Sequence, residues 1–213
     1  MKTKFYAAAH FLLAWLVRVI FLIFTVDRKN EPTLKEGNYL LVSNHISALD
    51  PVFICAALRR QQPRFMAKAE LFRNPASSAI LGAVGAYPID RSGANAGVLK
   101  KTVNMLENGF SVGMFPQGTR RPGVDPASTP VKNGVGLICE HSRATVLPVF
   151  IKVKGNKTGF LRPIRIIIGE AVTYDEYTAN GEFAKDTAHI TACLFDKVCK
   201  LGGTETEETD GQK

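Results

Sequence analysis

A histidine and an aspartate lie five positions apart in the segment Ser43–Pro51, between two stretches of apolar residues. The apolar run over residues 39–42 is typical of a buried strand, and the eight residues from the proline onward are typical of a helix. On one continuous helix His45 and Asp50 would point apart. The backbone is expected to turn between them, because a residue before proline avoids the helical region. The two side chains are therefore predicted to meet.

A neutral imidazole held by a carboxylate can accept a proton from a hydroxyl group near neutral pH. His45 is therefore a candidate general base, and Asp50 is the residue that would orient it. Asp50 is also expected to cap the following helix, with Pro51 at the first helical position. Taken alone, a histidine in this setting is more often an ordinary polar residue of a turn.

Two further stretches combine a strand with a polar loop that contains arginine. Residues 85–91, GAYPIDR, end in Arg91, and residues 115–121, FPQGTRR, contain Arg120. A guanidinium group can bind phosphate bidentately, so an arginine at a strand end is a candidate phosphate ligand. Any single arginine is more often a solvated surface charge, but two such strands beside the histidine favour a shared anion site.

Short apolar runs alternate with helical patterns from residue 39 onward. Strands are predicted over residues 39–42, 64–67, 86–89, 111–115, 145–153 and 164–168. Helices are predicted over residues 51–58, 75–84, 94–108, 131–142 and 182–201. This alternation predicts a single α/β domain with a mixed, mostly parallel sheet flanked by helices. Ligands of such sheets bind beyond the carboxyl ends of the strands, which is where His45 falls.

The charge of the chain is unevenly distributed. The 213 residues carry a formal net charge of +8, and 46% of them are hydrophobic, as in an ordinary globular domain. Residues 204–213 carry −3, so the rest carries +11. A basic body suggests phosphates or an anionic membrane as partners. Nucleic acid is not expected, because no basic stripe with stacking aromatics is present. The acidic tail has no apolar residue and is predicted to be disordered.

The N-terminal region is almost wholly apolar from Phe5 to Thr25, with His10 and Arg18 as interruptions. About 20 helical residues match the hydrocarbon core of a bilayer. We predict a membrane-anchoring hydrophobic helix within residues 1–28, followed by the folded domain over residues 29–203. A signal peptide and a buried core helix are the alternatives, and no small-residue cleavage site follows the apolar run. Whether the helix spans the membrane or lies in one leaflet stays open.

The four cysteines, Cys55, Cys139, Cys193 and Cys199, form no CxxC pair. We expect them to be reduced and structural, which fits a cytosolic face of a membrane. No cluster of cysteine and histidine with zinc-ligand spacing is visible, so no metal site is predicted.

Four stretches in this order resemble the four motifs of the glycerolipid acyltransferase family. They are Asn44-His45 to Asp50 for NHxxxxD, Gly85 to Arg91 for GxxxxxR, Phe115 to Arg120 for FPEGTR, and Val146 to Val149 for a Val/Ile-Pro-Val core. The segment Lys68 to Phe72 also resembles the stretch between the first two motifs. The resemblance covers residues 39 to 170, and the short chain with its apolar N-terminus is most similar to bacterial lysophosphatidic acid acyltransferases.

The resemblance implies transfer of a fatty acyl group from acyl-CoA or acyl-carrier protein to the sn-2 hydroxyl of lysophosphatidic acid. The product would be phosphatidic acid in phospholipid biosynthesis, and the reaction would need no cofactor. His45, oriented by Asp50, would be the general base, and no acyl-enzyme would form. The resemblance also implies a membrane-associated protein with its active site on the cytoplasmic face.

The resemblance further implies a set of substrate-binding residues. Arg91 and Arg120 would bind the acceptor phosphate, with Lys68 and Arg121 as weaker candidates. Pro148 would shape the site of the acyl chain or thioester. The other expected substrate-binding residues are Asn44, Gln117, Gly118 and Thr119. Of these, Gly118 would let the backbone approach a ligand closely.

One motif position departs from the family, because Gln117 stands where the family usually has glutamate. The amide loses the charge of the carboxylate and gains a hydrogen-bond donor. If the charge is needed, activity would fall or acceptor choice would change. If the side chain only orients the acceptor glycerol or a backbone amide, glutamine can serve. We favour the second interpretation, because the other motif positions are present.

Three alternative functions remain. The first is an acyltransferase with another acceptor, such as glycerol-3-phosphate or another lysophospholipid. The second is a membrane lipid-binding relative without catalysis. The third is a hydrolase with Ser43 or Ser47 as the nucleophile and His45 as its base.

Overall fold

The structure is a computed structural model that describes most of the chain. The described residues are 15–27, 30–32, 38–59, 62–83, 85–89, 95–159 and 162–203. The predicted disordered tail, residues 204–213, lies outside them.

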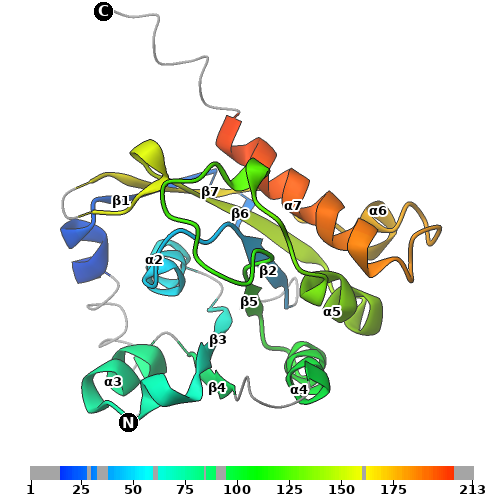
Figure 1. The fold of residues 1–213 in the computed structure, drawn as a ribbon, viewed down its shortest axis with the longest axis horizontal. Helices are drawn as coiled ribbons and strands as arrows, with labels where there is room; N and C mark the ends of the chain where they lie inside the picture. Colours follow the sequence, from blue (N-terminus) through cyan, green and yellow to red (C-terminus); the bar gives the residue numbers. More distant parts are fainter. Residues whose placement is uncertain are drawn as a thin grey trace, which may run out of the picture.

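Within the described residues, seven strands form one sheet in the order β1-β7-β6-β2-β5-β3-β4 (Figure 1). The strands are β1 (Ile23–Val26), β2 (Leu40–Ser43), β3 (Arg64–Lys68), β4 (Tyr87–Ile89), β5 (Val112–Met114), β6 (Val146–Lys152) and β7 (Ile164–Ile168). Every neighbouring pair is parallel except β6 and β7, which are antiparallel. The mixed, mostly parallel sheet and the six predicted strands are therefore confirmed.

Helices cover both faces of this sheet (Figure 1). They are α2 (Asp50–Ala57), α3 (Pro75–Ala83), α4 (Asn95–Glu107), α5 (Gly134–Ser142), α6 (Tyr174–Tyr177) and α7 (Thr187–Gly203), with the short 3₁₀ helices η3 (Ala69–Phe72), η4 (Pro126–Ser128) and η5 (Lys154–Asn156). Helix α2 packs on one face, and α5 and α7 pack against each other on the opposite face. The five predicted helices are present, whereas the short helix α6 was not predicted.

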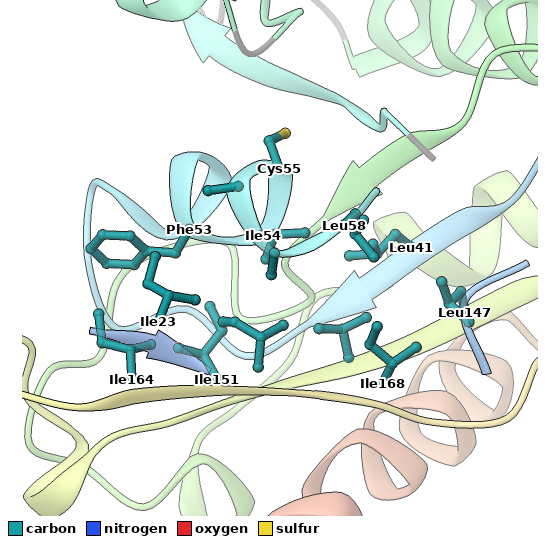
Figure 2. Packing of buried hydrophobic residues seen from close by; sticks show 14 of the residues in the cluster. Ile23, Leu41, Phe53, Ile54, Cys55, Leu58, Leu147, Ile151, Ile164 and Ile168 are labelled. Carbon is teal, nitrogen blue, oxygen red and sulfur yellow. The ribbon is translucent and has the colours of Figure 1, made fainter. Parts of the chain in front are cut away.

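The side chains of the central strands alternate between two apolar cores. From β6, Leu147, Val149 and Ile151 enter the core beneath α2, which Figure 2 shows from close by. Val146 and Phe150 of the same strand enter the second core, beneath α7. Full burial of such a side chain stabilises the folded state by about 1.5–3 kcal/mol relative to leaving it exposed. The two cores therefore hold the centre of the sheet rigidly, and with it the carboxyl ends of its strands.

The N-terminal region differs from the predicted continuous helix over residues 5–25. Residues 5–14 lie outside the described part of the chain, and residues 15–20 are helical. The next residues turn and form β1, in which Ile23 pairs with Ile164 of β7 and is buried. The prediction is therefore wrong for the last part of the segment, because β-branched residues at a sheet edge gain strand pairing and burial. The sheet also extends across the boundary expected at residue 29.

None of the helices within the described residues combines the length and the apolar character needed to span a membrane. All four cysteines are free, as predicted. Cys55 and Cys139 lie in the two different cores. Burial raises the pKa of each of these two thiols to about 12, so both stay protonated at neutral pH.

The contact between α5 and α7 gives a first prediction. A Cβ atom at Gly136 would collide with the carbonyl oxygen of Thr187, at the start of α7. Gly136→Ala should lower the free energy of unfolding by about 1–3 kcal/mol, because a backbone contact cannot easily give way. At Gly97, in α4, a Cβ would meet no atom within 4 Å. Gly97→Ala should raise the same quantity by about 0.5–1 kcal/mol. Urea unfolding of the full chain in detergent measures both, and a Gly136→Ala protein as stable as the parent would contradict the packing.

Candidate active site

The turn between β2 and α2 brings the predicted pair together. His45 Nδ1 lies 2.7 Å from Oδ2 of Asp50. The same oxygen accepts hydrogen bonds from the backbone N–H groups of Ile46, at 2.6 Å, and Ser47, at 2.8 Å. Residues 44–49 are not helical, and α2 begins at Asp50. The predicted bend between His45 and Asp50 is therefore confirmed, and one carboxylate oxygen organises the whole turn. The reason given for the bend is wrong, because Asp50, the residue before the proline, is itself helical, and Pro51 is the second helical residue and not the first.

The expected capping role of Asp50 is wrong. Leu49 occupies the N-cap position of α2, and no side chain caps the first turn. The Asp50 carboxylate points back into the preceding turn, where two backbone N–H groups and the imidazole use one of its oxygens. The other oxygen, Oδ1, is buried and has no hydrogen-bond partner among the described residues.

Burial sets the electrostatics of the pair. The Asp50 side chain is fully buried, and desolvation raises its pKa, while the hydrogen bonds from His45 and the turn act in the opposite direction. The imidazole is 18% exposed. Since Nδ1 faces a carboxylate, the neutral ring carries its proton there and leaves the Nε2 lone pair available. The described residues give Nε2 no hydrogen-bond partner, so a hydroxyl that reaches the ring can bond to it.

Two aromatic rings hold the imidazole from the side. Phe115 stacks on His45 with ring centroids 4.0 Å apart and an interplanar angle of 11°. Phe65 stacks on Phe115 in turn, at 5.5 Å and 20°. A Cβ at Gly113 would collide with the Phe65 ring, so glycine at this position lets the ring lie there. The stack restricts rotation of the imidazole, which the hydrogen bond to Asp50 alone would not do.

The loop after β5, residues 115–121, is here called the third-motif loop, and it holds the backbone of His45. Gln117 Oε1 accepts a hydrogen bond from the His45 N–H at 2.6 Å, and the Arg121 N–H donates to the His45 carbonyl at 2.8 Å. Gln117 Nε2 donates to Oγ1 of Thr129 at 2.7 Å, and that hydroxyl donates to the carbonyl of Pro126 at 2.6 Å. Gln117 is buried, and both ends of its amide are used. It therefore orients a backbone amide, as favoured from the sequence, and uses the donor that glutamate lacks.

Asn44 also positions the turn. Its side chain is fully buried, donates to the carbonyl of Ile151 at 3.0 Å and accepts from the Ile151 N–H at 2.8 Å. This pair of bonds continues the pairing of β2 with β6 by one side chain. The expectation that Asn44 contacts the substrate is therefore not supported, because its amide is already committed to β6.

The other expected substrate-binding residues fall into three groups. Lys68 is exposed and ends β3. Because β3 and β2 both run parallel to β5, Lys68 lies at the same edge of the sheet as His45. Gly118, Thr119 and Arg120 are exposed in the third-motif loop, where Gly118 has a φ of +66°. Arg91 lies outside the described residues.

Pro148 lies away from the imidazole. It is buried in the middle of β6 and pairs with Val42, three residues before His45. Its ring lies close to Gly169, on the side of the sheet that α7 covers. The structure therefore places this proline in the core beneath α7 and does not bring it to the site.

The hydrolase alternative lacks the geometry that it requires. Ser43 is fully buried, and its hydroxyl donates to the Asn44 carbonyl. The Ser47 hydroxyl accepts from the Leu49 N–H at 3.2 Å. Neither serine is hydrogen-bonded to His45, whose Nδ1 is taken by Asp50. A serine nucleophile activated by this imidazole is therefore not assembled.

Among the described residues, no group of three histidine, cysteine or acidic side chains lies close enough together to hold a metal ion.

Sequence reasoning missed three residues that hold the base. Phe115 lies in the third motif, and Arg121 was expected only as a weaker phosphate ligand. Stacking on His45 and a bond to its carbonyl are tertiary contacts, which the motif does not predict. Thr129 could not be recognised from the sequence, because no known motif places a threonine twelve positions after this glutamine.

Fold and site together define an α/β protein with a hydrogen-bonded histidine–aspartate pair at the carboxyl edge of its sheet. The chain belongs to the Acyltransferase family, whose family model matches residues 24–152.

Several known proteins resemble this chain. A 1-acyl-sn-glycerol-3-phosphate acyltransferase of Streptococcus pneumoniae is 36% identical over 116 residues, which cover 54% of this chain and 42% of that protein. The match thus spans less than half of that relative. A protein of the same name from Bacillus subtilis is 25% identical over 177 residues, which cover 82% of this chain and 85% of that one. The crystal structure of the 1-acyl-sn-glycerophosphate (LPA) acyltransferase PlsC from Thermotoga maritima shares the fold, with a TM-score of 0.59 and 22% identity, over 83% of this chain and 71% of that chain.

The buried amide of Gln117 gives the second prediction. Gln117→Ala should lower the free energy of unfolding by about 1–3 kcal/mol, because the His45 N–H loses its acceptor. Gln117→Glu keeps that acceptor but buries a carboxylate, whose pKa burial raises. Below the pKa of an exposed glutamate, the free energy of unfolding of Gln117→Glu should be only slightly lower than that of the parent. The difference should grow as the pH rises from that value through the raised pKa of the buried carboxyl. Urea unfolding at a series of pH values measures this. A Glu variant with a deficit independent of pH would contradict the burial of this position.

Proposed function

We propose that this protein transfers a fatty acyl group from a thioester, acyl-CoA or acyl-carrier protein, to the sn-2 hydroxyl of lysophosphatidic acid. The product is phosphatidic acid, a precursor in phospholipid biosynthesis. Family membership and the names of the relatives from Streptococcus pneumoniae and Bacillus subtilis support the reaction and the acceptor. The donor is an acyl thioester, and the reaction uses no cofactor.

One observation carries this proposal. The imidazole of His45 is held at Nδ1 by a buried carboxylate, and its ring remains partly exposed. This arrangement suits removal of a proton from an incoming hydroxyl and does not suit activation of a serine of the protein. It therefore supports direct transfer to an acceptor alcohol.

The reaction balances with the residues of the site. Nε2 of His45 accepts the proton of the sn-2 hydroxyl as the oxygen attacks the thioester carbonyl carbon. A C–O bond forms, and the carbonyl oxygen takes up the negative charge. The C=O double bond then re-forms as the C–S bond breaks. The imidazolium then gives its proton to the leaving thiolate. Asp50 stabilises the transient positive charge on the ring, and proton transfer of this kind typically contributes 10²–10⁴-fold to the rate.

The acceptor phosphate needs a cationic partner beside this base. Arg120 is exposed one residue before Arg121, whose N–H group donates to the His45 carbonyl. Arg120 therefore lies near the base in space, and its exposed side chain can approach a phosphate from solvent. Lys68 ends a neighbouring strand at the same edge of the sheet, and Arg91 is a third proposed phosphate ligand.

We further propose that the protein associates with a membrane, with its active site on the cytoplasmic face. Four large apolar side chains near the described N-terminus are exposed: Trp15, Leu16, Val19 and Phe24. Exposed apolar surface of this kind, next to the apolar residues 5–14, favours contact with lipid. The anchoring helix within residues 1–28 remains part of this proposal, ending before β1.

The test is a thioester-consumption assay with lysophosphatidic acid and glycerol-3-phosphate offered side by side in phospholipid vesicles. The parent protein should sediment with the vesicles and acylate lysophosphatidic acid preferentially. His45→Ala should lower kcat by about 10²–10⁴-fold, because the base is lost. His141→Ala, at an exposed histidine of α5, is the matched control and should keep the parental rate.

Three results would contradict the proposal. Equal turnover of parent and His45→Ala would exclude the base, and lysophosphatidic acid binding without turnover in the parent would identify a non-catalytic protein. Preferential acylation of glycerol-3-phosphate would transfer the assignment to another acceptor.

A further inference from the structure

The phenyl ring of Phe115 lies flat against the imidazole of His45. The ring centroids are 4.0 Å apart and the two planes differ by 11°, so the face of one ring covers the face of the other. The face of a phenyl ring carries partial negative charge, and it attracts a cation that lies within about 6 Å of its centroid. The contact is therefore placed to act on the charge of the imidazole as well as on its orientation.

The register of two neighbouring strands sets this contact. Strands β2 and β5 are parallel, and Val42 of β2 pairs with Met114 of β5. Phe115 follows Met114 directly, and His45 lies three residues after Val42. Both rings therefore leave the same edge of the sheet from adjacent strands, and the central part of the sheet holds them beside each other.

Phe65 of β3 holds the phenyl ring in place. Phe65 is 2% exposed, and it stacks on Phe115 with ring centroids 5.5 Å apart. A Cβ at Gly113 would collide with the Phe65 ring, so this ring occupies the place of a side chain at position 113. Phe115 is half-buried and packs against the core beneath α2. Movement of the phenyl ring away from the imidazole would therefore disrupt packing in this core.

Little water competes for a positive charge on this imidazole. The His45 side chain is 18% exposed, and the Asp50 side chain bonded to it is fully buried. The other charged residues beside the turn are the exposed Arg120 and the half-buried Arg121 of the third-motif loop. The attraction between a cation and an aromatic face is larger where water is excluded. The surroundings of this ring pair therefore favour a strong effect of the phenyl face on a charged imidazole.

We infer that Phe115 stabilises the imidazolium form of His45 during acyl transfer, the proposed function on which this inference rests. The imidazole becomes positively charged when Nε2 takes the proton of the acceptor hydroxyl, and the phenyl face then attracts that charge. The charge disappears when the proton passes to the sulfur of the leaving thiolate. A phenyl ring has no net charge, so it favours the imidazolium without holding the proton as firmly as a second carboxylate would.

Fluorinated phenylalanines at position 115 of the full chain in detergent test this inference. Fluorine withdraws negative charge from the face of the ring and changes its size little. With one, two and three ring fluorines, kcat for lysophosphatidic acid should fall step by step, to about 3–30-fold below the parent at three. The KM for lysophosphatidic acid should stay unchanged, because the imidazole is neutral before the proton moves.

The same fluorinated residues at position 65 are the matched control. Phe65 stacks on Phe115, and no ring contact joins it to the imidazole among the described residues. This series should keep the parental kcat. Phe115→Leu fills the position without an aromatic face, and it should lower kcat about as much as three fluorines do. Thermal unfolding of each variant separates a loss of stability from a loss of rate.

Nitrogen-15 NMR of the free protein adds a measurement that needs no turnover. At a pH where the parent holds both forms of the His45 ring, the imidazolium fraction should fall with each fluorine at position 115 and stay constant in the series at position 65. Asp50, Arg120 and Arg121 are the same throughout, so the trend reports the phenyl face alone.

Three results would overturn the inference. They are an imidazolium fraction that does not depend on fluorine at position 115, a kcat of an active parent that does not follow the number of fluorines there, and equal losses at positions 115 and 65. If the imidazolium fraction follows the fluorines but the parent transfers no acyl group, the charge contact stands and the proposed function fails.

Discussion

The hydrogen bond between His45 and Asp50 closes the turn from β2 to α2, and the site depends on it. Burying a carboxylate away from solvent costs free energy unless hydrogen-bond donors surround it. Here one oxygen of Asp50 receives two backbone N–H groups and the imidazole. The carboxylate therefore fixes the path of the backbone and the tautomer of the ring together. The rest of the fold supplies the rigid edge on which this turn lies.

Positioning of the base is shared among elements that are distant in sequence. Asn44 connects the turn to β6, Gln117 and Arg121 hold the two backbone groups of His45, and Phe115 limits the tilt of the ring. None of these contacts uses the outer nitrogen of the ring, and the imidazole stays 18% exposed. This division of roles accounts for a glutamine in the third motif, because its two ends bond to a donor and to an acceptor of different loops.

The sequence predicted the fold where local signals agreed with tertiary packing. The six strands from β2 to β7 are apolar runs bounded by turn residues, and the pairing of His45 with Asp50 was predicted from a bend of the backbone between them. Strand β1 was missed because an apolar run looks the same in a helix and in a strand. Pro148 was expected at the site from its motif, yet a motif position does not reveal which face of a buried strand it occupies. Phe115 and Thr129 act through contacts between loops, which a sequence pattern does not encode.

Nitrogen-15 NMR of the His45 imidazole tests the central claim most directly. The full chain is labelled at histidine in detergent, and the His45 signals are identified by their loss in His45→Ala. In its neutral form the ring should carry its proton on Nδ1 and leave Nε2 unprotonated, because Asp50 accepts a hydrogen bond from Nδ1–H. A ring with its proton on Nε2, or an even exchange between the two tautomers, would contradict the account.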